Sequence, residues 1–199
     1  MGHYAYRCPN LDEIRWQFNT SIAAGANGIS WFFYYMQTPE DNYRLSPVDE
    51  FWEKTQTYYD IRRVQRGFHK RYKDLFNRLV STRVSFSGTP YGGIEAFTPN
   101  DIIKGVALGG KSGMLIGEFT NIQGKRYAMF VSNSMTESQQ YHVTFPKNAR
   151  LFSQDWYGHE YEGAAYNNVG VNTDKDGNVV HSMYLAPGQE VVYRVEIGK

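Results

Sequence analysis

The sequence has a single cysteine, Cys8, and no long apolar run, and each absence excludes a class of protein. One cysteine cannot form a disulfide within the chain, so a disulfide-stabilised scaffold is excluded. No stretch reaches the about 18 consecutive apolar residues that a membrane-spanning helix requires. We therefore expect no membrane partner.

The sequence also lacks an excess of charge of one sign. The 21 Lys and Arg residues nearly balance the 20 Asp and Glu residues, which leaves a formal net charge of +1. The densest basic stretch, residues 62–73, places its charges mainly on the polar face of a predicted helix. This pattern indicates a solvated face, and we expect no nucleic-acid partner.

The residues that commonly hold metals or phosphates lack the required spacing. The five histidines show no metal-ligand pattern. Residues 174–178, DKDGN, resemble a calcium loop only slightly, and we predict a hairpin turn there. Residues 109–113, GGKSG, lack the spacing of a phosphate-binding loop and no helix follows them. We expect no metal and no cofactor.

Aromatic residues are abundant: they make up 16% of the chain. They are dense in residues 25–37, GANGISWFFYYMQ, where the part from Gly28 to Tyr35 carries no charge and no polar alternation. Such a run after a short turn is typical of a strand covered on both faces, as in a parallel sheet flanked by helices. We predict a buried strand over residues 28–35.

Two amphipathic helices flank this run. The first is predicted over residues 11–25, with Asn10 as its cap and Glu13 in the position of a capping box. The second is predicted from Ser46, with Pro47 at the first helical position, to about residue 80. Its apolar stripe consists of Ile61, Val64, Phe68, Tyr72, Leu75 and Leu79. The order helix, strand, helix is that of an α/β fold.

The pattern changes at residue 81. Short alternating runs rich in Gly, Thr, Val and Tyr follow, separated by turn signals, which is typical of an antiparallel β-sandwich. The predicted strands cover residues 83–86, 114–119, 127–132, 141–145, 151–156, 179–185 and 191–197. The predicted fold class is thus α/β followed by all-β, with one domain over residues 1–80 and a β-sandwich over residues 81–199.

Three motifs in the first 34 residues resemble the last part of a (β/α)8-barrel glycoside hydrolase. They are RWQFN at residues 15–19, AAGANGI at residues 23–29 and WFFY at residues 31–34. In that family the matching segments are the seventh helix and the eighth strand, and a C-terminal β-sandwich commonly follows the barrel. The resemblance covers residues 1–80 in motif detail and residues 81–199 only in architecture.

The resemblance implies that the sequence is the C-terminal portion of such an enzyme. A full barrel takes roughly 250 residues, whereas residues 1–80 supply one strand and two helices, a partial TIM-barrel segment. Glycoside hydrolysis requires two carboxyl groups, which in this family stand on strands that precede this segment. The catalytic residues are therefore unknown, and we expect the chain alone to be inactive. The implied partners are a carbohydrate and either the missing N-terminal barrel segment or a second copy of the chain.

Three residues are expected to bind substrate: Trp31, Tyr35 and Glu40. The end of this strand faces the active site in the family, where an indole can stack on a sugar ring. Strand alternation places Trp31 and Tyr35 on one face and directs Phe32 and Tyr34 toward the helices. Glu40 lies in the loop after the strand. A core role for Trp31 and a solvated loop at Glu40 are the alternatives.

Two further functions stay open. A stand-alone carbohydrate-binding module would use aromatic residues of the sandwich, namely Tyr91, Trp156 and Tyr157. A non-catalytic structural protein would neither bind sugar nor hydrolyse it.

Overall fold

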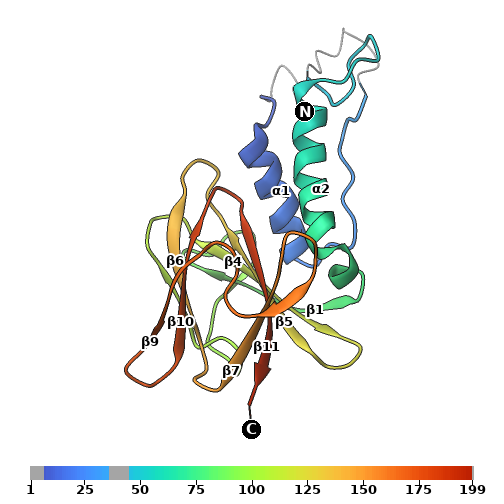
Figure 1. Ribbon diagram of the computed structural model, residues 1–199. Helices are drawn as coiled ribbons and strands as arrows, with labels where there is room; N and C mark the ends of the chain where they lie inside the picture. Colours follow the sequence, from blue (N-terminus) through green and yellow to red (C-terminus); the bar gives the residue numbers. More distant parts are fainter. Residues whose placement is uncertain (1–6, 36–44, 199) are drawn as a thin grey trace.

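The computed structural model describes residues 7–35 and 45–198, which form a pair of helices above two packed β-sheets (Figure 1). The helices are α1 (Leu11–Ala23) and α2 (Gln56–Phe76). The large sheet has the strand order β2-β1-β4-β5-β11-β7-β8 and the small sheet has the order β3-β6-β10-β9. The predicted strand-rich part is thus confirmed.

The strand bounds are as follows. The large sheet contains β1 (Leu79–Ser87), β2 (Glu95–Ala96), β4 (Met114–Asn121), β5 (Arg126–Ser132), β7 (Ala149–Gln154), β8 (Glu160–Glu162) and β11 (Glu190–Ile197). The small sheet contains β3 (Gly105–Leu108), β6 (Gln139–Phe145), β9 (Asn168–Thr173) and β10 (Val179–Leu185). Each of the seven predicted runs overlaps a strand, whereas β2, β3, β8 and β9 were not predicted. All strand neighbours in the described residues are antiparallel except β1 and β2.

The predicted hairpin turn at residues 174–178 is confirmed. It joins β9 to β10, which pair antiparallel. Asp174 Oδ1 accepts hydrogen bonds from the backbone N–H groups of Asp176 and Asn178, at 2.9 and 2.8 Å. The carboxylate is therefore occupied in closing the turn, as Asp side chains often are.

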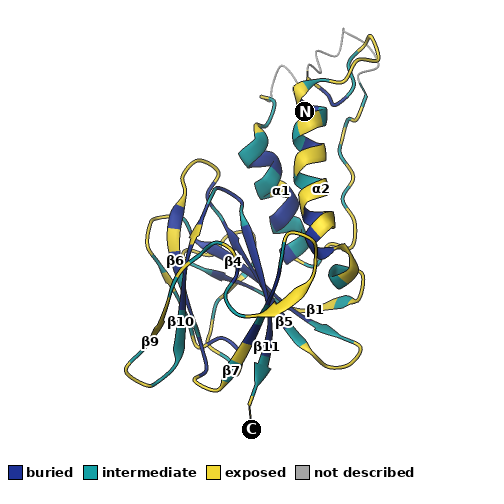
Figure 2. Cartoon of the chain, viewed as in Figure 1, coloured by how far each residue is buried: buried dark blue, intermediate teal, exposed yellow. Residues whose placement is uncertain are grey.

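The main core lies between the two sheets. The rings of Phe130, Phe145 and Tyr193 meet there, with centroid separations of 5.5 to 6.5 Å. β5 and β11 are buried over almost their whole length, because the small sheet covers one face and the helices cover the other (Figure 2). This explains why these strands are apolar on both faces.

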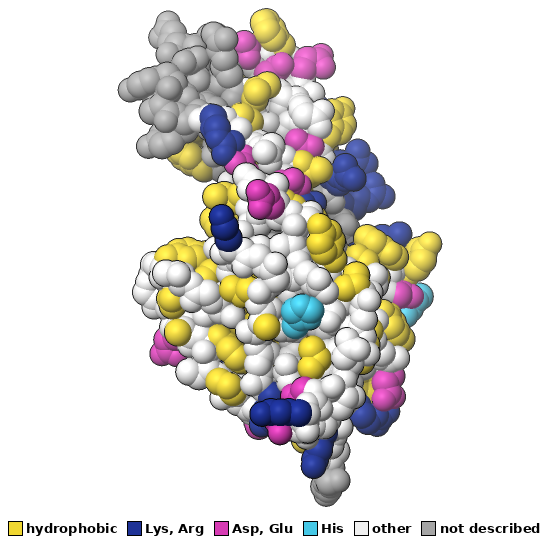
Figure 3. All heavy atoms as spheres, turned by 90° about the vertical axis from the view of Figure 1, so that its left-hand side faces the viewer, with side chains coloured by type: hydrophobic (Ala, Val, Ile, Leu, Met, Phe, Trp, Pro, Cys, Tyr) yellow, Lys and Arg dark blue, Asp and Glu magenta, His cyan; other side chains and the backbone are white. Residues whose placement is uncertain are grey.

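The face of the molecule on the side of β9 and β10 carries mainly uncharged side chains at its centre (Figure 3). Three apolar residues on these strands are exposed, namely Val169, Val171 and Tyr184. Scattered exposed apolar side chains of this kind are normal on soluble proteins and require no binding partner.

Helix α1 forms as predicted at its N-terminus. Asn10 Oδ1 accepts a hydrogen bond from the Glu13 backbone N–H at 3.0 Å, and the Asn10 N–H donates to Glu13 Oε2 at 2.9 Å. This is the reciprocal capping box. The helix ends at Ala23, two residues earlier than predicted, and Gly25 adopts a φ of 92° in the turn that follows. Glycine tolerates this left-handed conformation without steric cost.

Removal of the cap should weaken the helix measurably. We expect Asn10→Ala to lower the free energy of unfolding by about 1 kcal/mol, because the Glu13 backbone N–H loses its side-chain acceptor, while the backbone N–H of residue 10 is kept. Urea denaturation measures this change. The control is Asn172→Ala, at an exposed position of β9, which should change stability by less than about 0.5 kcal/mol. Equal losses in the two variants would contradict a capping role.

The predicted start of the second helix is wrong. Helix α2 begins at Gln56 with Thr55 at its cap, ten residues after Ser46, and ends at Phe76. Residues 46–54 form a tight loop instead, in which Val48 pairs with Lys54. Asp49 Oδ1 accepts hydrogen bonds from the backbone N–H groups of Phe51 and Glu53. A side chain that satisfies nearby backbone donors in this way competes with helix formation.

The prediction of a buried strand over residues 28–35 is also wrong. We call these residues the aromatic segment. Their only ladder contact among the described residues is an isolated parallel bridge from Tyr35 to Val48. Phe32 is 74% exposed and Tyr34 is 47% exposed. The segment runs alongside α2 (Figure 1), where no described strand lies next to it to pair with its backbone. A partial TIM barrel is therefore not confirmed.

The helices pack on the outer face of the large sheet. Phe18, Phe68 and Tyr72 form a second buried cluster with sheet residues such as Leu115 and Met129. Closest approach occurs at Gly117 on β4, where a Cβ atom would collide with the backbone carbonyl oxygen of Ala23. The end of α1 is thus seated directly on the sheet backbone.

This close approach gives a second stability prediction. We expect Gly117→Ala to cost about 1–3 kcal/mol, because the added methyl group must displace the end of α1 from the sheet. The matched control is Gly28→Ala, since nothing lies within 4 Å of a Cβ at that position. Thermal unfolding of both variants would show the difference. Unchanged stability in Gly117→Ala would mean that α1 does not dock here in solution.

Candidate functional site

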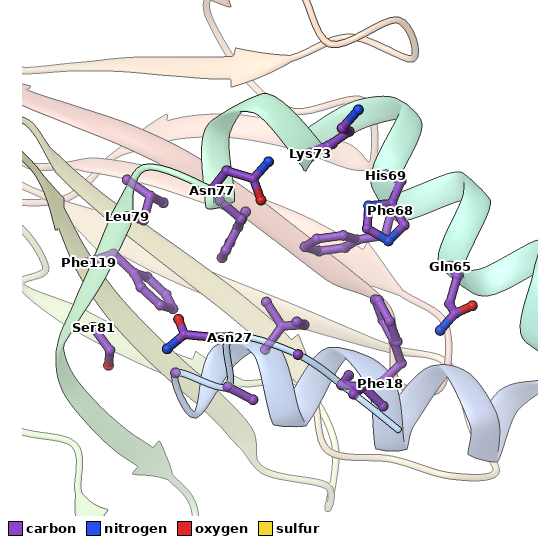
Figure 4. Close-up of a pocket in the computed structure, with 16 residues that line it drawn as sticks. Phe18, Asn27, Gln65, Phe68, His69, Lys73, Asn77, Leu79, Ser81 and Phe119 are labelled. Carbon is purple, nitrogen blue, oxygen red and sulfur yellow. The ribbon is translucent and has the colours of Figure 1, made fainter. Parts of the chain in front are cut away.

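Two hollows open beside the aromatic segment, and both are lined by α2. The first hollow, a cavity of about 420 Å³, lies between the end of α1, the turn at residues 25–29, α2 and the sheet (Figure 4). The second hollow, of about 360 Å³, lies between Tyr34 and α2. Gln65 and His69 line both of them. The segment and this helix therefore form one continuous candidate surface.

The first hollow has an apolar floor and a polar rim. Phe18 packs edge-on against Phe68, and Phe76 packs edge-on against Phe119, each pair with a centroid separation of 5.3 Å. The rim carries the polar side chains of Asn27, Gln65, His69, Lys73 and Asn77 (Figure 4). An apolar cavity of this size with a few polar groups is typical of small-molecule sites.

The second hollow combines phenol rings with basic and amide groups. Tyr34 and Tyr58 supply the rings, and Arg62, Gln65 and Arg66 supply hydrogen-bond donors. No described Asp or Glu lines either hollow. Glycoside hydrolysis uses a pair of carboxyl groups, and the described lining of these two hollows consists of aromatic, basic, amide, hydroxyl and aliphatic groups.

The expected substrate-binding residues take different places. Trp31 is half-buried against the helix–sheet cluster, and its indole Nε1 is buried without a hydrogen-bond acceptor among the described residues. Tyr35 stacks on Trp52, with ring centroids 4.2 Å apart and an interplanar angle of 19°. Glu40 lies outside the described residues. The structure therefore associates Tyr35 with Trp52, which the sequence had not indicated as a site residue.

The side chains of the aromatic segment alternate between exposed and half-buried, as expected, although the segment is not a strand. Trp31, Phe33 and Tyr35 are half-buried, whereas Phe32 and Tyr34 are exposed. Phe32 does not pack on a helix as expected, because it is largely exposed and stacks on the neighbouring Phe33. Tyr34 borders the second hollow on α2 and is only partly covered by it.

Trp52 is the residue that sequence reasoning missed. It is 73% exposed and has a φ of 65°, in the tight loop before α2. The sequence does carry a signal there, the adjacent aromatic residues Phe51 and Trp52 beside acidic residues, but the helix predicted from Ser46 includes this pair. Together, Trp52 and Tyr35 make a two-ring stack with a large accessible surface.

The aromatic residues of the sandwich are engaged by protein groups. The Tyr91 hydroxyl donates to Asn133 Oδ1 at 3.0 Å, and partial burial raises the pKa of this tyrosine. The guanidinium carbon of Arg71 lies 3.9 Å from the Trp156 ring centroid. Lys70 Nζ lies 4.3 Å from the ring centroid of Tyr157. Tyr91 and Trp156 therefore belong to separate local clusters.

No group of three or more His, Cys, Asp or Glu residues in the described part of the chain is placed to hold a metal ion. Neither α1 nor α2 is long and apolar enough to cross a membrane. The sequence matches none of the protein-family models, curated proteins or solved structures with which it was compared.

Proposed function

We propose that the chain is the C-terminal portion of a (β/α)8-barrel glycoside hydrolase. In this proposal α1, the aromatic segment and α2 belong to the barrel, and the two sheets form an accessory β-sandwich. The observation that carries the proposal is the aromatic segment, which has the composition of a buried strand, lies between α1 and α2 in the sequence and belongs to neither described sheet. Strands on both sides of it would pair its backbone and cover Phe32.

The exposed apolar residues near the same end of the molecule support this assignment. They are Phe32, Tyr34, Leu45, Phe51, Trp52 and Tyr59. Exposed large apolar side chains that gather at one end of a molecule are suited to an interaction site. We favour the missing N-terminal barrel segment as the partner over a second copy, because βα units supply both strand neighbours and covering side chains.

The proposed substrate is a carbohydrate, bound by Trp31, Tyr35 and Glu40. Tyr35 and Trp52 offer a flat, partly apolar surface on which a sugar ring can stack. The pair of catalytic carboxyl groups would come from barrel strands that precede this segment. The chain alone should therefore not hydrolyse glycosides.

Amide hydrogen exchange tests the strand assignment. The comparison is between the 199-residue chain and a protein extended through the coding sequence upstream of Met1. We expect residues 28–35 to exchange on the order of 100-fold more slowly in the extended protein, because pairing would protect their N–H groups. Residues of β10, already paired on both sides, serve as the internal control. Equal exchange of residues 28–35 in both proteins would refute the assignment.

A stand-alone carbohydrate-binding module is the second candidate, because Trp156 and Tyr157 are adjacent and largely exposed. It predicts sugar binding by the 199-residue chain that is weakened by Tyr157→Ala as well as by Trp156→Ala. It also predicts no turnover by the extended protein. Calorimetry with soluble oligosaccharides separates it from the hydrolase proposal.

A further inference from the structure

A third hollow, which we call the junction pocket, lies where the two helices meet the sandwich. Its volume is about 310 Å³. Arg15 and Asn19 of α1, Arg63 and Arg71 of α2, and Trp156, Tyr166, Gln189 and Glu190 of the sandwich contribute to its lining. It uses a different set of α2 positions from the second hollow beside the aromatic segment.

The inner end of the junction pocket is a buried polar cluster. Glu190 Oε1 lies 3.3 Å from Arg71 Nη1, and Glu190 Oε2 accepts a hydrogen bond from Asn19 Nδ2 at 2.8 Å. Two polar atoms of this cluster, Asn19 Oδ1 and Arg71 Nε, are buried without a partner among the described residues. One is an acceptor and the other is a donor. A hydroxyl group can satisfy both, since it donates and accepts.

Aromatic rings form one wall of the junction pocket. The Arg71 guanidinium carbon lies 3.9 Å from the Trp156 ring centroid and 4.3 Å from that of Tyr166. Trp156 is nevertheless 55% exposed, and Tyr166 is also exposed. The wall therefore offers accessible ring surface close to the Arg71 guanidinium. Ring faces beside hydroxyl-binding groups are suited to a sugar, which has both polar edges and apolar C–H faces.

The charges in the junction pocket do not cancel. Its lining holds three arginines and one carboxylate. Arg15 is paired with Asp12, and Arg71 is paired with Glu190. Arg63 is exposed and has no ion-pair partner among the described residues. Its guanidinium group is therefore available for a planar anion, and a carboxylate fits its geometry.

We propose that the junction pocket binds an acidic saccharide, a sugar that carries a carboxylate. Its hydroxyl groups pair with Asn19 Oδ1 and Arg71 Nε, its ring lies against Trp156, and its carboxylate meets Arg63. This site is separate from the aromatic segment and does not depend on the proposed hydrolase function.

Titration of the 199-residue chain with glucuronate, glucose and acetate, followed by NMR, tests the proposal. We expect saturable shifts at the Trp156 indole N–H with glucuronate, at an affinity at least about tenfold above that for glucose or acetate. Arg63→Gln should reduce the affinity for glucuronate about tenfold, to the level of glucose. Arg78→Gln is the control, since Arg78 is an exposed arginine just after α2 that lines none of the three hollows.

A second pair of variants tests whether the sugar contacts the Trp156 ring. Trp156→Ala should abolish saturable binding of glucuronate, whereas Tyr157→Ala, at an exposed position outside the lining, should leave it unchanged. Circular dichroism shows whether each variant is folded. If Trp156→Ala does not fold, Arg63→Gln still tests the site independently. Three results would overturn the proposal: no saturable binding of glucuronate, equal affinity for acetate or glucose, or a loss in Arg78→Gln equal to that in Arg63→Gln.

Discussion

Replacement of Arg71 by alanine is expected to lower the free energy of unfolding by about 3–5 kcal/mol. Arg71 is 5% exposed, and it is the counter-charge of the buried Glu190 carboxylate. Burial raises the pKa of Glu190 above its usual range, so the carboxylate is already costly to keep charged. Without Arg71 this charge would be left buried and uncompensated. The variant would also lose the contact of the guanidinium with Trp156 and Tyr166.

Urea denaturation of three variants tests this expectation. Arg66→Ala, at an exposed position of the same helix, should change stability by less than about 0.5 kcal/mol. The double replacement Arg71→Met with Glu190→Leu should recover most of the loss, because neither charge then remains buried. The loss in Arg71→Ala should be smaller in acid than at pH 8, since protonated Glu190 needs no counter-charge. Equal losses in Arg71→Ala and Arg66→Ala would show that the pair is not buried in solution.

The second large effect is a loss of stability in mild acid caused by His181. Burial lowers the pKa of this imidazole from 6.5 to about 4 in the folded protein. The folded state therefore keeps His181 neutral at a pH where the unfolded chain binds a proton. The stabilising contribution is fully present above pH 6.5 and is lost as the pH falls from 6.5 toward 4. It amounts to on the order of 3 kcal/mol.

Denaturation at a series of pH values between 7 and 4 measures this contribution. His181→Gln should flatten the dependence of unfolding free energy on pH over this interval, whatever its effect at pH 7. Asn172→Ala is the control, because it changes an exposed position of β9 and removes no titratable group. An unchanged slope in His181→Gln would mean that His181 is not held neutral by burial.

The parts of the fold that sequence predicts well are those with a local signal. Asn10 and Glu13 mark the start of α1 because both hydrogen bonds of the capping box are made within four residues. β10 matches the predicted residues 179–185, since this short run contains β-branched and apolar residues, of which Met183 and Leu185 are buried in the core. The missed strands β8 and β9 are mostly exposed, so burial imposed no such pattern on them.

The features that sequence could not predict depend on contacts between distant positions. Arg71 and Glu190 are 119 residues apart in the sequence. The residues around each of them give no sign that the two side chains form an ion pair. The stack of Tyr35 on Trp52 depends on the loop that delays the start of α2. The composition of the aromatic segment indicates that it needs cover on both faces, but composition does not specify which part of the molecule supplies that cover.

Glycosidase activity measured with and without the upstream coding sequence tests the central claim most directly. We predict that the extended protein releases nitrophenol from at least one nitrophenyl glycoside, whereas the 199-residue chain releases none above the uncatalysed rate. Trp31→Ala in the extended protein should lower kcat/KM by about tenfold or more, as expected for loss of an aromatic contact with the sugar. Turnover by the 199-residue chain alone, or an extended protein without further βα units and without turnover, would contradict the proposed function.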